Sequence, residues 1–279
     1  MIQNDAAAFT AFENKESPSY KQLVSDFRNI GIGAGDTVVV HSSMKSMGYV
    51  EGGAECVIAA LADVVGTEGT LMFPTFTFAT SYGDSFFSNK DTPSCVGLLS
   101  EVFRKMDGVY RTNHPTHSVA LYGKLTASLI DGEELDDTPM GVHSPYQRLA
   151  EVGAKILMIG CSTGHNSYMH ALEEAAGVEY ALRGHQEYTV VDGDGNTRSR
   201  RVRRHNFARP EGTVHQRYAR ALDVLEEGEY KTALIHGASS VLMDCVALKN
   251  RVLQKMKHDP LYFVDDPCGF YANGCKTTL

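Results

Sequence analysis

The sequence predicts an α/β protein, with a three-layer α/β/α-type domain, a mixed and largely parallel sheet, and a late β-hairpin. Short apolar runs rich in β-branched residues alternate with amphipathic segments along most of the chain. The 279 residues suit one large domain, and 43% hydrophobic with 22% charged residues is typical of a soluble globular protein. "DGDGN" at 192–196 separates two alternating stretches, which indicates a hairpin turn. We expect one domain over residues 1–279, with a C-terminal tail at 266–279.

The first half of the chain is expected to alternate between helices and strands. A helix should begin at Ser17-Pro18 and end at Gly31, since serine and proline favour helix starts and glycine favours helix ends. Expected next are a strand at 36–43, a helix at 53–66, a strand at 70–77, a helix at 96–108 and a strand at 118–123.

The second half repeats this alternation around the hairpin. A short helix at 144–153 should precede an apolar strand at 154–161, and a second helix should start at Asn166 or Ser167 and end at Gly177. After the hairpin we expect a helix at 212–228, then one strand and a long helix within 232–260.

Composition excludes several classes of protein. A net charge of −8 argues against nucleic-acid binding, and no apolar run reaches the length of a membrane span. The N-terminus lacks the basic and apolar regions of a secretory signal. The six cysteines contain no CxxC pair, so we expect reduced thiols, no structural zinc and a cytoplasmic protein. Cys268 and Cys275 could form a disulfide in an oxidising compartment.

Polar side chains follow three of the expected strands: "HSSMKSMG" at 41–48, "PTFT" at 74–77 and "CSTGHNS" at 161–167. Ligand crevices in open α/β sheets form at strand ends, so these segments are expected to meet. The first segment offers hydroxyls, backbone N–H groups and glycine, which suits a phosphate or pyrophosphate group.

The helix after the third segment places a carboxylate one turn from His170. Glu173 and Glu174 follow it at i+3 and i+4, where either could orient an imidazole acting as a general base. A solvated surface pair would have the same spacing. A metal site through His165, His170 and Glu173 fits less well, because five residues do not place two histidines on one helical face. We therefore expect no metal.

"GCSTG" at 160–164 matches the G-x-S-x-G pattern of the α/β-hydrolase nucleophile elbow and leaves a serine hydrolase open. The elbow requires a helix that begins at the serine, whereas Asn166 and Ser167 indicate a later start.

Six segments together resemble the aminoglycoside 3-N-acetyltransferase family: "VVVHSSMKSMGYVEGGAECVIAAL", "GTLMFPTFT", "RTNHPTHSVALYG", "HSPYQRLAEVGAKILMIGC", "NSYMHALEE" and "DPLYFVD". The resemblance extends over about residues 18–265 and implies an α/β/α sandwich-like fold with acetyl-CoA in a cleft and an amine acceptor opposite it. The family's H-x-x-E segment falls on His170 and Glu173, and its preceding hydroxyl on Ser167.

The same resemblance implies the coenzyme contacts. The coenzyme loop falls on His41, Ser42, Ser43, Met44, Ser46 and Gly48, and the H-P-x-x-S segment on His114, Pro115 and Ser118, expected near the thioester. Thr75 is expected as a further coenzyme contact. His170 would take the proton of the attacking amine, and Ser167, Thr75 or a backbone N–H would stabilise the oxyanion. Direct transfer is favoured over an acyl-enzyme on Cys161.

The acceptor expected first is the 3-amino group of an aminoglycoside antibiotic, since the resemblance is extensive and the net charge has the matching sign. Gly164 stands where members that act on these drugs carry an acidic residue, so a smaller or anionic amine remains an alternative. A non-catalytic CoA-binding relative is a third. The arginines between 198 and 204 fit a salt-bridged surface or an oligomer contact, for example in a homodimer.

Overall fold

A seven-stranded mixed sheet forms the centre of the structure, a computed structural model that describes residues 12–78, 84–209, 212–267 and 269. The strand order is β12-β13-β6-β1-β2-β5-β4. The three central strands, β6 (Lys155–Ile159), β1 (Thr37–Ser42) and β2 (Thr70–Pro74), are parallel. The outer strands pair antiparallel: β12 (Tyr230–Ile235), β13 (Ala238–Asp244), β5 (Val119–Gly123) and β4 (Tyr110–Arg111). Parallel pairing is thus confined to the centre of the mixed sheet.

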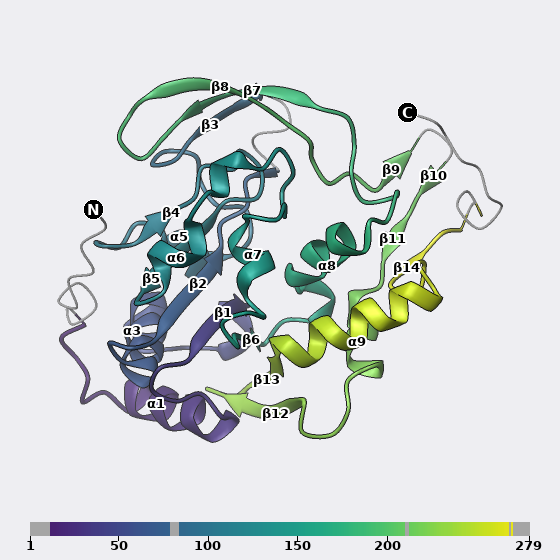
Figure 1. Cartoon of the computed structure of the whole chain (residues 1–279). Helices are drawn as coiled ribbons and strands as arrows, with labels where there is room; N and C mark the ends of the chain where they lie inside the picture. The colour runs from purple at the N-terminus through teal and green to yellow at the C-terminus, as the bar shows by residue number, and fades with distance from the viewer. Residues whose placement is uncertain (1–11, 79–83, 210–211, 268, 270–279) are drawn as a thin grey trace.

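Helices cover both faces of this sheet because its strands are apolar on both sides (Figure 1). In β1, Val38 and Val40 face one core, formed with α1 (Pro18–Ile30), α3 (Gly53–Val65) and α5 (Leu98–Phe103). Val39 faces the other, formed with α6 (Thr126–Ile130), α7 (Pro145–Arg148), α8 (Tyr168–Ala176) and α9 (Cys245–His258). The predicted three-layer architecture is confirmed.

The local signals for helix ends act as predicted. Ser17 Oγ accepts a hydrogen bond from the Tyr20 N–H, and Gly31 adopts φ 115° at the end of α1. At α8, Asn166 Oδ1 accepts from the Tyr168 N–H at 3.0 Å, and Gly177 ends the helix at φ 68°. These caps fix where the helix of His170 begins and ends.

Two predicted elements are wrong. The single strand expected after residue 232 is a hairpin, because His236 (φ 46°) and Gly237 (φ 81°) form a tight turn between β12 and β13. The helix expected at 212–228 is replaced by β10 (Gly212–Thr213), β11 (His215–Gln216) and the 3₁₀ helix η4 (Tyr218–Asp223). Buried Tyr218 and Ala221 are three residues apart, a spacing that both helix types share.

The predicted hairpin is present as β7 (Gln186–Val191) and β8 (Thr197–Val202), and β3 (Phe86–Ser88) pairs with β7 in parallel. This small sheet arches over one end of the molecule, and the chain after β8 continues toward α8 and β9 (Ala208–Arg209) (Figure 1). Arg198 forms an ion pair with Glu134, and the buried Arg200 donates to the carbonyls of Glu134 and Asp136. The arginine run therefore contributes internal contacts.

Further short elements complete the described chain: α2 (Met44–Met47), η2 (Glu133–Leu135), η3 (Thr163–His165) and β14 (Val264–Asp265). Cys268 and Cys275 lie outside the described residues. In the part of the chain that the structure describes, every helix is too short or too polar to cross a membrane.

Candidate active site

A cavity of about 660 Å³ opens where the three parallel strands end. His41 and Ser42 come from the end of β1, Pro74 from the end of β2, and Cys161 follows β6. The other lining residues come mainly from the loop before α8, from α8 itself, and from the segments after β8 and before η4: Ser43, Phe76, Phe78, Cys95, Val96, His117, Gly164, His165, Asn166, Ser167, His170, His205, Asn206, Phe207, Gln216 and Tyr218. The three polar segments of the sequence do meet here.

His170 lies in this cavity with a carboxylate and a phenol behind it. Its Nδ1 is 3.0 Å from Tyr218 Oη and 3.4 Å from Glu173 Oε2. The Tyr218 hydroxyl donates to Glu173 Oε2 at 2.6 Å, and the Glu173 side chain is fully buried. The three side chains therefore form one hydrogen-bonded group.

This group selects one tautomer of His170. Burial, followed by the nearby Glu173 carboxylate, raises the pKa of Tyr218 well above its usual value, so the phenol keeps its proton. Because that proton is given to Glu173, the phenol oxygen can accept from Nδ1–H. A proton on Nδ1 leaves the lone pair of Nε2 as the basic site of the ring.

Two more histidines pack against His170, and a third packs against one of these two. The His205 ring stacks on it with centroids 4.5 Å apart and an interplanar angle of 24°, and His117 lies edge-on at 6.0 Å. His114 is 6.0 Å from His117. Burial lowers the pKa values of His114, His117 and His205 well below the usual range, so these rings are neutral near pH 7. Across the described residues, no set of His, Cys, Asp or Glu has the geometry of a metal site.

The coenzyme residues predicted from 41–48 divide into two groups. His41, Ser42 and Ser43 line the cavity, and burial lowers the pKa of His41 to about 3, which makes it a neutral group. Met44 and Ser46 lie in α2, which Gly48 ends. Ser46 Oγ donates to the Gly160 carbonyl at 2.7 Å and so ties α2 to the end of β6.

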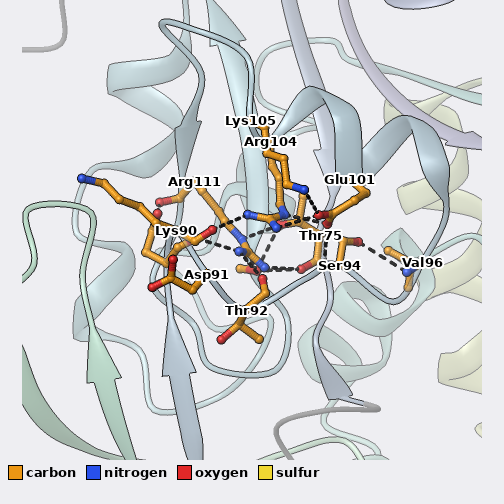
Figure 2. A network of polar contacts seen from close by, with 12 residues as sticks. Thr75, Lys90, Asp91, Thr92, Ser94, Val96, Glu101, Arg104, Lys105 and Arg111 are labelled. Atoms are coloured by element: carbon orange, nitrogen blue, oxygen red, sulfur yellow. Dashed lines mark hydrogen bonds and ion pairs between the residues drawn. The ribbon is translucent and has the colours of Figure 1, made fainter. Parts of the chain in front are cut away.

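Thr75 and Ser118 lie beneath the cavity and do not line it. Both are fully buried, and their hydroxyls are 3.0 Å apart. The Arg111 guanidinium donates from Nη2 to the Thr75 carbonyl (Figure 2). It also donates from Nε to Ser118 Oγ. His114 lines a separate small pocket, and its neighbour His117 takes the place in the main cavity. In this arrangement the hydroxyls of Thr75 and Ser118 serve internal contacts.

The "GCSTG" segment does not form a nucleophile elbow. Ser162 is exposed and does not line the cavity, and its Oγ accepts from the Gly164 N–H at 3.1 Å as the cap of η3. Helix α8 begins only at Tyr168. Gly160 adopts φ 60°, and a Cβ there would lie 2.5 Å from Ser46 Cβ. The glycine is thus explained by close packing and a left-handed backbone.

Three residues of the site were missed by sequence reasoning: His117, His205 and Tyr218. His117 precedes a strand, His205 follows a basic strand, and Tyr218 lies in a segment expected to be helical. They come from separate parts of the chain, and only the tertiary structure brings them to His170. The one feature of the sequence that could have indicated His117 and His205 was the number of histidines near the ends of expected helices and strands.

Comparison with known proteins identifies the family. The family model for aminoglycoside 3-N-acetyltransferase matches residues 39–257. Aminoglycoside N(3)-acetyltransferase VII of Streptomyces paromomycinus is 33% identical over 197 residues, covering 62% of this chain and 66% of that protein. Aminoglycoside N(3)-acetyltransferase VIII of Streptomyces fradiae is 34% identical over 176 residues, covering 56% and 60%. The chain thus matches less than two thirds of the length of these relatives.

Solved structures have the same fold. AAC-IIIb, solved as a binary complex with CoASH, superposes with a TM-score of 0.75 at 23% identity, covering 86% of this chain and 96% of that one. The AAC(3)-IVa apoenzyme gives 0.73 at 25% identity, covering 92% and 93%. Since the family model matches well over half of the sequence, the chain belongs to the aminoglycoside 3-N-acetyltransferase family.

Proposed function

We propose that this chain transfers the acetyl group of acetyl-CoA to a primary amine, with His170 as the general base. The observation that carries this proposal is the Tyr218–Glu173–His170 group, in which both polar contacts of the imidazole are made by Nδ1. Nε2 then has its lone pair available to a molecule in the cavity that His170 lines. The family and the solved CoASH complex of a relative support acetyl-CoA as the donor.

The reaction follows from this geometry. The amine nitrogen attacks the thioester carbon while His170 Nε2 takes its proton, and Glu173, reached through Tyr218, stabilises the imidazolium. The C–S bond of the tetrahedral intermediate then breaks, and the leaving thiolate takes the proton from His170 to give CoASH. Ser167 lines the cavity three residues before His170 and supplies a hydroxyl for the oxyanion.

Direct transfer is favoured over an acyl-enzyme. Cys161 lines the cavity, but burial raises the pKa of its thiol to about 11, which disfavours the thiolate. Ser162 lies outside the cavity. Neither residue is therefore suited to carry the acetyl group.

The segment 41–43 is proposed to contact the pantetheine arm. His41 is neutral, and the described residues lining the cavity include neither lysine nor arginine, so this wall suits amide groups better than phosphates. Ser42 and Ser43 provide hydroxyls for such contacts.

The acceptor has two candidates. The names of the relatives favour an aminoglycoside. The cavity favours a smaller amine, because the described lining has five imidazoles and three phenylalanine rings but no carboxylate to pair with several ammonium groups. Glu173 lies behind His170 and Glu174 is engaged by His205, so neither faces the acceptor as a free carboxylate.

The test is release of CoASH from acetyl-CoA, measured as free thiol with a panel of amines. The panel contains a 2-deoxystreptamine antibiotic, neutral aromatic amines and aminophosphonates, with mass spectrometry of the product. An acetylated amine from any class supports the proposal, and the class with the highest kcat/KM identifies the acceptor. Acetyl-CoA that is untouched, or hydrolysed at a rate independent of every amine, would refute it.

A further inference from the structure

Helix α8 holds a second imidazole–carboxylate pair directly beside the first. Glu174 follows Glu173, and Glu174 Oε1 is 2.7 Å from His205 Nε2. Both side chains are nearly inaccessible, at 3% exposed for His205 and 7% for Glu174. The Met140 N–H donates to the same carboxylate oxygen at 2.9 Å. Two consecutive glutamates of one helix therefore each hold a histidine from the cavity wall.

The held ring of His205 is the surface on which His170 rests. The two imidazoles are nearly parallel, with centroids 4.5 Å apart, whereas Tyr218 and His117 meet His170 edge-on at 85° and 83°. Phe207 lies 5.8 Å from His170 at a tilted angle. One flat face of His170 is thus covered by a ring that is itself anchored.

We propose that His205, anchored by Glu174, is a positioning residue for His170. This inference rests on the proposed function, because it concerns the orientation of His170 as the general base. Tyr218 and Glu173 fix the Nδ1 edge of His170 but allow the ring to rock about that edge. The parallel ring of His205 fixes the plane, and with it the direction of the Nε2 lone pair toward the acceptor. A general base that is displaced by about an ångström from its reactive position transfers the proton much more slowly.

The charged and titratable groups around the stacked rings of His170 and His205 are consistent with a positioning role for His205. Glu173 of α8 and Tyr218 of η4 face His170. Glu174 and Arg203 lie near His205. His117, from the segment before β5, packs edge-on against both imidazole rings. Burial, followed by the neighbouring His170, lowers the pKa of His205 well below the usual range. His205 therefore stays neutral while His170 takes up a proton, which avoids two positive charges in contact.

The experiment separates the ring of His205 from its contact with Glu174. His205→Gln keeps a polar group near Glu174 but removes the ring. His205→Phe combined with Glu174→Gln keeps a flat ring and leaves no buried carboxylate without a partner. Glu174→Gln alone serves as the reference for the double variant. His185→Ala is the matched control, because His185 and Asp137 form an imidazole–carboxylate pair away from the cavity, with Nε2 and Oδ2 2.8 Å apart.

We expect His205→Gln to lower kcat about tenfold or more, with KM for acetyl-CoA changed less than about threefold. The double variant should stay within about threefold of Glu174→Gln, and His185→Ala should match the wild type. If the double variant loses as much as His205→Gln, or His205→Gln keeps its kcat, the proposal is overturned. Melting curves of each variant establish that the folded protein is compared.

A spectroscopic measurement tests the positioning without turnover. In ¹H–¹⁵N spectra of the imidazoles, His170 should be a single Nδ1–H species in the wild type and in the double variant, and a mixture of tautomers or a broadened signal in His205→Gln. An unchanged His170 signal in His205→Gln would overturn the positioning role. Absence of acetyl transfer by the wild type with every amine would instead refute the proposed function and leave this measurement standing.

Discussion

Two buried polar clusters lie on either side of Thr75 and Phe76, and they are built in opposite ways. Around Arg111, each guanidinium nitrogen has an acceptor: Ser118 Oγ and the carbonyls of Asn89, Thr92 and Thr75. Figure 2 shows Thr75 and Thr92 beside the guanidinium. Around His170, one imidazole stacks on it and another meets it edge-on, and among the described residues His41 Nε2 and His114 Nε2 have no hydrogen-bond partner. The first cluster is closed by its own contacts, whereas the second borders a cavity.

The difference shows what each cluster is for. The fully hydrogen-bonded guanidinium of Arg111 connects β4, β2 and the loop after β3. Burying this charged group has a free-energy cost, because burial lowers the pKa of Arg111 to about 9. A group of neutral imidazoles at a cavity holds proton acceptors ready for a ligand. We therefore expect damage to the first cluster to reduce stability and damage to the second to reduce activity.

The largest expected effect is on stability, at Arg111. Arg111→Met leaves the carbonyls of Asn89, Thr92 and Thr75 without their donor, and should lower the free energy of unfolding by about 4 kcal/mol. Urea titration followed by circular dichroism measures it. Lys124→Met, which breaks an ion pair with Glu68 at the surface, is the control and should cost less than about 1 kcal/mol. Equal losses in the two variants would remove the contrast between the clusters.

His170→Ala should produce the opposite pattern. Acetyl transfer should fall roughly 100-fold or more, because proton removal is lost, while acetyl-CoA binding and the melting temperature change little. Steady-state kinetics and calorimetric titration measure the two quantities. His143→Ala is the control, since His143 pairs with Asp136 and does not line the cavity. Near wild-type turnover in His170→Ala would exclude His170 as the base.

The groups behind His170 should have smaller effects. Glu173→Gln and Tyr218→Phe each weaken the hold on Nδ1 but leave the imidazole in place, so we expect losses of about tenfold in kcat. The double variant should lose little more than either single one, because the phenol and the carboxylate act as one chain. Strictly additive losses would show that they act separately.

Glu174 predicts a dependence of stability on pH. Burial raises the pKa of Glu174 to about 7 from an ordinary 4.5, so folding favours the protonated form. Its contribution to stability is full below pH 4.5 and is lost as the pH rises toward 7. Relative to Glu174→Gln, the wild type should lose about 3 kcal/mol of unfolding free energy over this range, seen in melting curves at each pH. A constant difference between the two proteins would contradict the assignment.

The smallest effect is expected at Ser162. Ser162→Ala removes the cap of η3, which costs about 1 kcal/mol of stability, and should leave acetyl transfer within a few-fold. A fluorophosphonate probe should not label this serine. Covalent labelling together with loss of all activity would restore the hydrolase hypothesis.

The sequence was informative where structure is decided locally. Ser17 and Gly31 bound α1 as predicted, and Asp192 to Asn196 form the predicted hairpin turn, because capping and turn residues act over a few positions. The turn at His236-Gly237 was missed although it carries the same kind of signal, since an apolar run on both sides looked like one strand.

The candidate site could be predicted only in part. His170 and Glu173 are one helical turn apart, so their pairing can be inferred from spacing. Tyr218 is 48 positions from His170, and no local rule brings a residue of a 3₁₀ helix to that ring. Thr75 and Ser118 were expected at the coenzyme, but a hydroxyl beside the end of a strand can equally serve a buried arginine, as it does here.

The adjacency of Glu173 and Glu174 limits how this segment can change in length. Successive residues of an α-helix point about 100° apart, which is how neighbours reach His170 and His205 on different sides. A single residue inserted between His170 and Glu173 would turn both carboxylates away from their histidines at once. Insertions should therefore be rejected in α8 yet accepted at the exposed tip 194–196 of the β7–β8 hairpin, which makes that tip the place to attach a label or an affinity tag.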